Sequence, residues 1–137
     1  MIYLLDTDIC IYWLKGQQSV QAQVQQVGIQ NLAISTITAA ELYYGAYYSQ
    51  SIARNLQRAT TFIQNLAVLN LTLPAVQQFG ELKASLRKTG TPIADMDFFI
   101  ASIALTKNRV LVTNNLRHYQ RIPGLKLENW ATLSHEH

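Results

Sequence analysis

The stretch Tyr3-Leu4-Leu5-Asp6-Thr7-Asp8-Ile9 decides the fold that we expect for this chain. Its first residues are apolar or aromatic and lack alternation, which is typical of a strand buried on both faces of a parallel sheet. Apolar residues return at helical spacing from Cys10 to Leu14. Asp6 therefore stands where a central strand ends, at the crevice in which open α/β sheets bind their ligands.

A carboxylate at the edge of an apolar core is costly unless something compensates for its charge. Two interpretations of Asp6 remain open from this stretch alone. In the first, Thr7 or Asp8 caps the following helix and Asp6 is simply part of the turn. In the second, Asp6 binds a cation.

Length and composition favour one folded domain over residues 1–137, with a frayed tail at 131–137. The chain has 137 residues, of which 49% are hydrophobic, enough for one core. It lacks the apolar run of about 20 residues that crosses a bilayer, and its start lacks the basic region of a signal peptide. Cys10 is the single cysteine, which excludes an intramolecular disulfide and a Cys-rich zinc site. We therefore expect a cytoplasmic protein without a membrane partner, with Cys10 packed in the core.

The charged residues say more through their positions than through their number. The net charge of +3 gives a mild preference for polyanionic partners. Only eight residues are acidic, and five of these lie among apolar neighbours: Asp6, Asp8, Glu41, Asp95 and Asp97. Acids placed beside core segments do not primarily serve solubility.

Strands and helices alternate along the chain. We expect strands at 2–5, 32–35, 68–71, 110–113 and 125–130, and helices at about 10–14, 19–30, 36–48, 52–66, 74–88 and 95–105. A turn is expected at 89–92. The pattern predicts an α/β fold with three layers, α/β/α, around a four- or five-stranded, mainly parallel sheet. Right-handed crossovers then bring the carboxyl ends of all strands to one rim.

Three further acids can be interpreted in two ways. Glu41 follows Thr38 by three residues, which is the capping-box pattern and, on its own, favours a backbone cap over a ligand. Asp95 and Asp97 open an apolar helix, where one of them could cap the helix and interact with its dipole. A cap does not explain why Asp97 lies within the apolar segment. Asn115 follows the fourth expected strand.

These oxygen-bearing side chains fall at strand ends or in first helical turns, so they should meet at one rim. No Lys or Arg partners them within these motifs. Like charges packed together raise each other's pKa, and a divalent cation relieves that repulsion. Mg²⁺ takes oxygen ligands and keeps waters that a substrate phosphate can displace. With a basic chain and no glycine-rich nucleotide loop, the pattern points to metal-dependent phosphodiester hydrolysis.

Four motifs carry a resemblance to a known family: Leu5-Asp6-Thr7-Asp8, Ile34-Ser35-Thr36-Ile37-Thr38-Ala39-Ala40-Glu41-Leu42, Asp97-Phe98-Phe99-Ile100-Ala101-Ser102 and Leu111-Val112-Thr113-Asn114-Asn115. In this order and at these separations, the chain resembles the PIN-domain ribonucleases, specifically the VapC-type toxins of bacterial toxin–antitoxin pairs. The closing segment 119–130, with Ile122-Pro123-Gly124-Leu125, is also similar to that family.

The resemblance implies a catalytic set of three acids and one amide: Asp6, Glu41, Asp97 and Asn115. Three further polar residues would support this set: Thr7, Asp95 and Thr113. The three acids would hold Mg²⁺ or Mn²⁺, and Glu41 would steer or deprotonate the attacking water, leaving 5′-phosphate and 3′-hydroxyl ends. The family usually has Asp at the fourth position, so Asn115 brings one charge fewer.

The resemblance also implies partners. Basic side chains would hold the RNA substrate through its phosphates: Lys83, Arg87, Arg117 and Arg121. A cognate, VapB-like antitoxin would lay an amphipathic segment into a groove between helices. A homodimer is expected as well, for which residues 43–48 and the helix at 52–66 offer apolar surface.

Two other functions stay open. Asp6-Thr7-Asp8 after the first strand also fits the Asp-x-Asp nucleophile motif of haloacid-dehalogenase-like phosphatases, although the lysine and acidic metal pair of that family are hard to place here. The second alternative is a catalytically weakened PIN domain that binds RNA or a partner protein, which Asn115 would explain.

Overall fold

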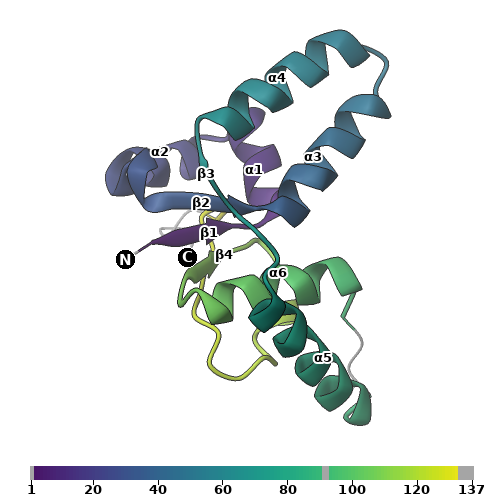
Figure 1. Ribbon diagram of the computed structural model, residues 1–137. Coiled ribbons are helices and arrows are strands. Elements are labelled where there is room, and N and C mark those ends of the chain that lie inside the picture. Colours follow the sequence, from purple (N-terminus) through teal and green to yellow (C-terminus); the bar gives the residue numbers. More distant parts are fainter. Residues whose placement is uncertain (1, 91–92, 133–137) are drawn as a thin grey trace.

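Five parallel strands form a sheet between two layers of helices, which confirms the expected three-layer α/β/α architecture (Figure 1). The computed structural model describes residues 2–90 and 93–132. The strand order is β3-β2-β1-β4-β5. Among the described residues, no helix is both long enough and apolar enough to cross a membrane. The elements are β1 (Tyr3–Leu5), α1 (Thr7–Leu14), α2 (Gln18–Val27), the 3₁₀ helix η1 (Ile29–Asn31), β2 (Leu32–Ser35), α3 (Thr36–Tyr47), α4 (Ile52–Gln64), β3 (Ala67–Leu69), α5 (Leu73–Lys88), α6 (Asp95–Thr106), β4 (Val110–Val112), α7 (Leu116–Tyr119) and β5 (Leu127–Glu128).

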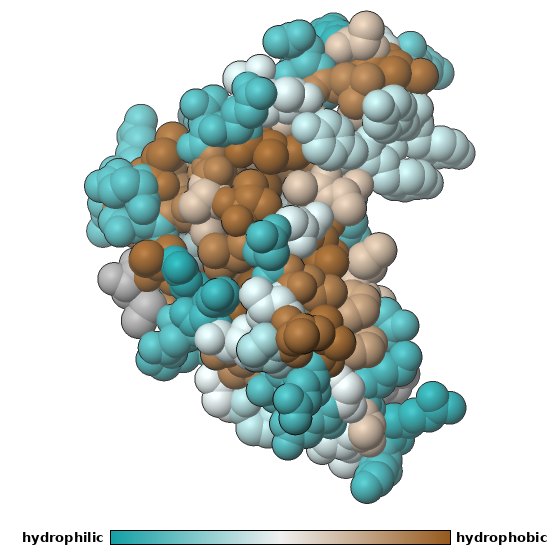
Figure 2. Space-filling model, viewed as in Figure 1, coloured by the Kyte–Doolittle hydropathy of each residue, from teal (hydrophilic) through white to brown (hydrophobic). Residues whose placement is uncertain are grey.

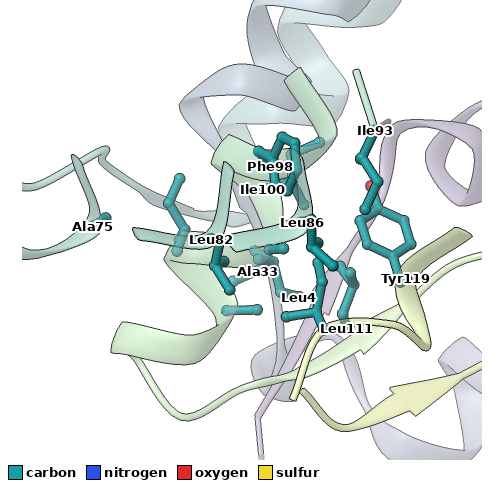
Figure 3. Packing of buried hydrophobic residues seen from close by; sticks show 14 residues of the cluster. Leu4, Ala33, Ala75, Leu82, Leu86, Ile93, Phe98, Ile100, Leu111 and Tyr119 are labelled. Carbon is teal, nitrogen blue, oxygen red and sulfur yellow. The ribbon is translucent and has the colours of Figure 1, made fainter. Parts of the chain in front are cut away.

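Successive side chains of β1 enter two different hydrophobic cores. Leu4 packs with Ile100 and Leu111 in the core that α5 and α6 cover (Figure 3). Leu5 packs with Val112 in the core on the other face of the sheet, beneath α1 and α2. Because both faces of β1 are covered, both kinds of position must be apolar, and the strand therefore lacks the alternation of a half-exposed strand.

The parallel register fixes the rim on which the polar side chains gather. β1 lies between β2 and β4, with Leu5 opposite Val112. Asp6 follows the end of β1, Ser35 ends β2 and Thr113 follows β4. Since the strands run in the same direction, these three positions share one edge of the sheet, as in other open parallel sheets.

The arm formed by α3 and α4 extends away from the sheet (Figure 1). Its distal end exposes Tyr44, Tyr47 and Tyr48, and the rings of Tyr44 and Tyr48 stack with centroids 5.8 Å apart. The surface is hollowed between this arm and the helices α5 and α6 (Figure 2). The first turns of α3 and α6 open toward this hollow side of the molecule (Figure 1).

Several boundaries differ from those expected. α1 begins at Thr7, earlier than expected, because Asp6 takes the N-cap position. The polar segment after β4 contains the short helix α7, and β5 is restricted to two residues of the expected 125–130. The expected turn at 89–92 and the tail at 131–137 lie partly outside the described residues, since 91–92 and 133–137 are not among them.

Candidate metal and active site

Asp6 is a buried carboxylate held at the rim by two hydrogen bonds. Only 5% of its surface is exposed. The backbone N–H of Thr7 donates to Oδ1 at 2.7 Å, and the Thr113 hydroxyl donates to Oδ2 at 2.8 Å. Asp6 is thus itself the N-cap of α1, so the interpretation in which Thr7 or Asp8 caps this helix is wrong. Within the described part of the chain, no Lys or Arg forms an ion pair with Asp6.

The surroundings of Asp6 disfavour its charged form. Burial raises the pKa of this carboxyl to about 7, and the charges of Asp97 and Asp8 act in the same direction. The hydrogen bonds from Thr113 and Thr7 lower the pKa but do not offset burial. A carboxyl group whose charged form is disfavoured at neutral pH is a good candidate for a cation ligand, because a bound cation would stabilise that charged form.

Glu41 is connected to Asp6 through Thr7. The N-cap of α3 is Ser35, whose side chain accepts from the N–H of Thr38 at 3.0 Å. The capping-box interpretation of Glu41 is therefore wrong, because the helix has already begun at that point. Instead, the Thr7 hydroxyl donates to Glu41 Oε1 and shares a hydrogen bond of 3.0 Å with the Thr38 hydroxyl. Thr7 thus binds one carboxylate through its backbone and the other through its side chain.

Asp97 and Asp95 point to different surroundings. The N-cap of α6 is Ala94, and neither acid caps the helix with its side chain. Asp97 Oδ2 lies 3.0 Å from His118 Nε2, and its side chain is 29% exposed. Asp95 is more exposed and pairs with Lys83 at 2.9 Å. Asp97 contributes to the raised pKa of Asp6, so it is the acid of this pair that acts on the buried carboxylate.

Asn115 occupies the N-cap position of α7, but its side chain makes no capping hydrogen bond. Its backbone N–H donates to the Thr113 hydroxyl at 3.0 Å. That hydroxyl in turn donates to Asp6, so Thr113 connects the end of β4 to the buried acid. The side chain of Asn115 is exposed at the rim.

Taken together, the structure brings Asp6 and Glu41 to the two sides of Thr7 and places Asp97 within electrostatic reach of Asp6. In the described ranges, no three His, Cys, Asp or Glu side chains are close enough to ligate one ion as they stand. The donor chemistry nevertheless fits a hard divalent cation, because the set consists of carboxylate oxygens around one buried acid. Asp6, Glu41 and Asp97 are the residues that could hold it.

The basic side chains expected to bind RNA differ in their availability. Lys83 is engaged by Asp95 and lies over the ring of Phe79, 5.7 Å from its centroid. Three others are exposed and form no ion pair within the described residues: Arg87, Arg117 and Arg121. Arg117 lies on α7, directly after the rim.

A pocket of about 270 Å³ adjoins the acids on one side. It lies between α1, α3 and α4, and its lining includes Ile11, Leu14, Lys15, Glu41 and Arg58. The rest of its lining is apolar apart from Asn55, and Glu41 is the acid of the candidate site that it reaches.

Sequence reasoning missed two residues of the site, His118 and Tyr119. Both lie on α7, in a segment for which the sequence predicted neither a strand nor a helix. His118 contacts Asp97, and Tyr119 is fully buried. One signal was available, since an aromatic residue within a short polar segment is a candidate for burial.

The PIN-domain family model matches residues 3–125 of this chain. The tRNA(fMet)-specific endonuclease VapC of Salmonella typhimurium is 38% identical over 129 residues, or 94% of this chain and 98% of the relative. Ribonuclease VapC2 of Rickettsia felis is 38% identical over 132 residues, or 95% and 98%. The crystal structure of DNA-bound VapBC from Salmonella typhimurium has a TM-score of 0.89 at 37% identity, covering 95% of this chain and 98% of that chain. The chain therefore belongs to the PIN-domain family, among its VapC ribonucleases.

This assignment excludes the haloacid-dehalogenase-like phosphatase as the fold family, and that alternative was wrong. The Asp-x-Asp spacing of Asp6 and Asp8 is a coincidence of sequence, because Asp8 is exposed and makes no contact with the buried carboxylate other than through its charge.

Proposed function

We propose that this chain is a metal-dependent endoribonuclease and the toxin of a type II toxin–antitoxin pair. The observation that carries the proposal is the buried carboxylate of Asp6 at the strand rim, with Glu41 and Asp97 as its acidic neighbours. The VapC relatives, named as ribonucleases, support RNA as the substrate. We further propose that residues 1–137 form one nuclease domain, and that it acts in the cytoplasm, where RNA substrates are found.

The metal would be held by Asp6 and Asp97, with Glu41 bound directly or through a water. Nucleases of this family generally depend on a divalent metal, and carboxylate ligands favour Mg²⁺ or Mn²⁺. When bound, the ion supplies positive charge that stabilises the charge developing on the scissile phosphate.

The side chains of this chain would orient the reaction. Glu41, held by the Thr7 hydroxyl, steers the attacking water or accepts its proton. The water oxygen forms the new bond to phosphorus while the bond to the 3′ oxygen breaks, and a proton ends on that oxygen. The products are a 5′-phosphate and a 3′-hydroxyl. Asn115 can hydrogen-bond near the phosphate but adds no negative charge at the fourth position.

Removal of divalent metal tests this function. We expect the purified protein to cleave RNA with added Mg²⁺ or Mn²⁺, to lose cleavage in excess EDTA, and to regain it when the metal is restored. The RNA panel should include initiator tRNA, because one relative is named for tRNA(fMet). Labelled 5′ and 3′ ends identify the products. Binding of RNA without metal-dependent cleavage would instead support the alternative of a weakened, RNA-binding PIN domain.

We propose that Lys83, Arg87, Arg117 and Arg121 guide RNA by its phosphates, the two arginines around α7 most directly. Replacing Arg117 and Arg121 together by Ala should weaken RNA binding measured in EDTA. The plot of the logarithm of the association constant against the logarithm of salt concentration should also become shallower, by roughly 1.4 for single-stranded RNA. The matched control is the double variant Lys107→Ala/Lys126→Ala, which removes two exposed charges at the opposite rim. Equal loss in both double variants would show a general charge effect and contradict the assignment.

We also propose a VapB-like antitoxin partner and a homodimer. The similar structures include VapBC complexes, one of them solved with promoter DNA. The apolar pocket between α1, α3 and α4 suits an amphipathic segment that ends beside Glu41. The exposed tyrosines of the α3–α4 arm suit a subunit contact. Co-expression with the product of the neighbouring open reading frame, followed by measurement of the mass of the purified complex, tests both.

A further inference from the structure

Tyr119 carries a hydroxyl that the mechanism above does not use. The residue is fully buried, and its ring packs in the core with Ile93, Leu86 and Leu111 (Figure 3). Within the described part of the chain, the hydroxyl has no hydrogen-bond partner. A buried polar atom without a partner is destabilising, and a phenylalanine would fill the same space without that cost.

The hydroxyl end of Tyr119 lies toward Ile93, in the segment that leads into α6 (Figure 3). The Tyr119 ring lies 5.6 Å from the ring of His118, whose Nε2 is 3.0 Å from Asp97 Oδ2. Burial raises the pKa of the Tyr119 phenol far above its ordinary value, and the charges of Asp6, Asp97 and Glu41 raise it further. Asp97 also raises this pKa as a hydrogen-bond acceptor, although the phenol completes no hydrogen bond of ordinary geometry. The phenol is therefore placed to reach Asp97 but has no completed hydrogen bond.

Each of the three acids already has a polar neighbour. Asp97 Oδ2 faces His118, 3.0 Å away, and Glu41 accepts from Thr7. Both oxygens of Asp6 already accept hydrogen bonds. A cation held by Asp6 and Asp97 would attract the Asp97 carboxylate and change the direction in which it presents its oxygens. Two buried polar atoms of the described residues have no hydrogen-bond partner, His118 Nε2 and the Tyr119 hydroxyl. His118 Nε2 already lies 3.0 Å from Asp97 Oδ2, so the hydroxyl is the one that pairs with no acid.

We propose that Tyr119 is a positioning residue of the metal site, whose O–H donates a hydrogen bond to the Asp97 carboxylate when a divalent cation is bound. The inference rests on the proposed function, because it takes Asp97 as a metal ligand. Hydrogen bonds from surrounding groups fix the orientation of ligating carboxylates, and their loss typically lowers metal affinity 10–100-fold, as an order of magnitude. The hydroxyl keeps its hydrogen, so no proton is transferred.

The substitution Tyr119→Phe removes only the hydroxyl and leaves the ring to fill the core. We expect the Mn²⁺ dissociation constant, measured by calorimetry on the full chain, to rise about tenfold. Without metal, the variant should melt at the same or a higher temperature than the wild type, because an unpartnered polar atom has been removed. At a Mn²⁺ concentration that saturates the wild type, the wild type should melt at the higher temperature, because the ion stabilises the protein that binds it more tightly.

Tyr3→Phe is the matched control, because Tyr3 lies at the opposite end of β1 from Asp6 and packs on Trp130. It should leave Mn²⁺ affinity unchanged. If the hydroxyl has a merely structural role, Tyr119→Phe should alter the melting temperature equally with and without metal and leave the Mn²⁺ affinity at the wild-type value. That outcome would overturn the role of Tyr119 but not the proposed function. If the wild-type protein itself binds no Mn²⁺, the proposed metal site fails and the inference fails with it.

Discussion

Asp6→Asn is expected to lower RNA cleavage by about a thousandfold or more, the loss that corresponds to roughly 4 kcal/mol of transition-state stabilisation by a bound metal. The amide preserves the shape of the side chain and an oxygen that accepts from the N–H of Thr7. The Thr113 hydroxyl can rotate to accept from the new amide group, so the fold should persist. What is lost is the negative charge that would hold the cation. Cleavage rates at saturating Mg²⁺, with circular dichroism as a check on folding, measure the effect.

Asp8→Asn provides the control for that substitution. Asp8 lies on the same helix, two residues further along, but is exposed and contacts no other described side chain through a hydrogen bond or an ion pair. Its replacement should change cleavage by no more than about twofold, the usual range for a surface site. If Asp6→Asn cleaved RNA as fast as Asp8→Asn, the assignment of the buried carboxylate to the chemistry would be wrong.

The metal-free protein is expected to lose stability as the pH rises from 5 to 8, because of Asp6. Its folded-state pKa is raised from 3.8 to about 7, so between these values the folded state holds a proton that the unfolded state has released. The free energy of unfolding therefore falls with increasing pH in this window and levels off above it. Relative to Asp6→Asn, the wild type should lose about 3 kcal/mol between pH 5 and pH 8.

Urea unfolding of both proteins in EDTA at the two pH values measures this difference, and comparison with the variant cancels the contributions of other groups. Added Mn²⁺ should restore the stability of the wild type at pH 8 and leave Asp6→Asn unaffected, since only the former offers the buried charge. A difference between the two proteins that stays constant from pH 5 to pH 8 would contradict the raised pKa.

The sequence predicted the sheet and the position of Asp6 well, because both follow from local patterns. Leu4 and Leu5 are both apolar, and only a strand covered on two faces requires that. The parallel order of strands then places Asp6 at the rim without further information. The polar ends of buried strands are in this sense the most predictable parts of such a site.

Local patterns failed where a side chain had two possible partners. Glu41 matched a capping box, but Ser35 already caps the helix, so the acid is directed to Thr7 instead. The contact between His118 and Asp97 joins α7 to the first turn of α6, across the strand β4. No periodicity predicts such a contact, because it depends on how the chain after β4 returns across the rim.

The pairing of β1 with β4 has a consequence for the order in which the protein is made. Thr113 and Asp6 are 107 positions apart, and β1 has β4 as one of its two neighbours. A nascent chain released before Val110 leaves its first strand with an open edge and its first acid without the threonine that holds it. The candidate site can therefore assemble only after the chain has been synthesised through β4 and Thr113, however early its first acid is made.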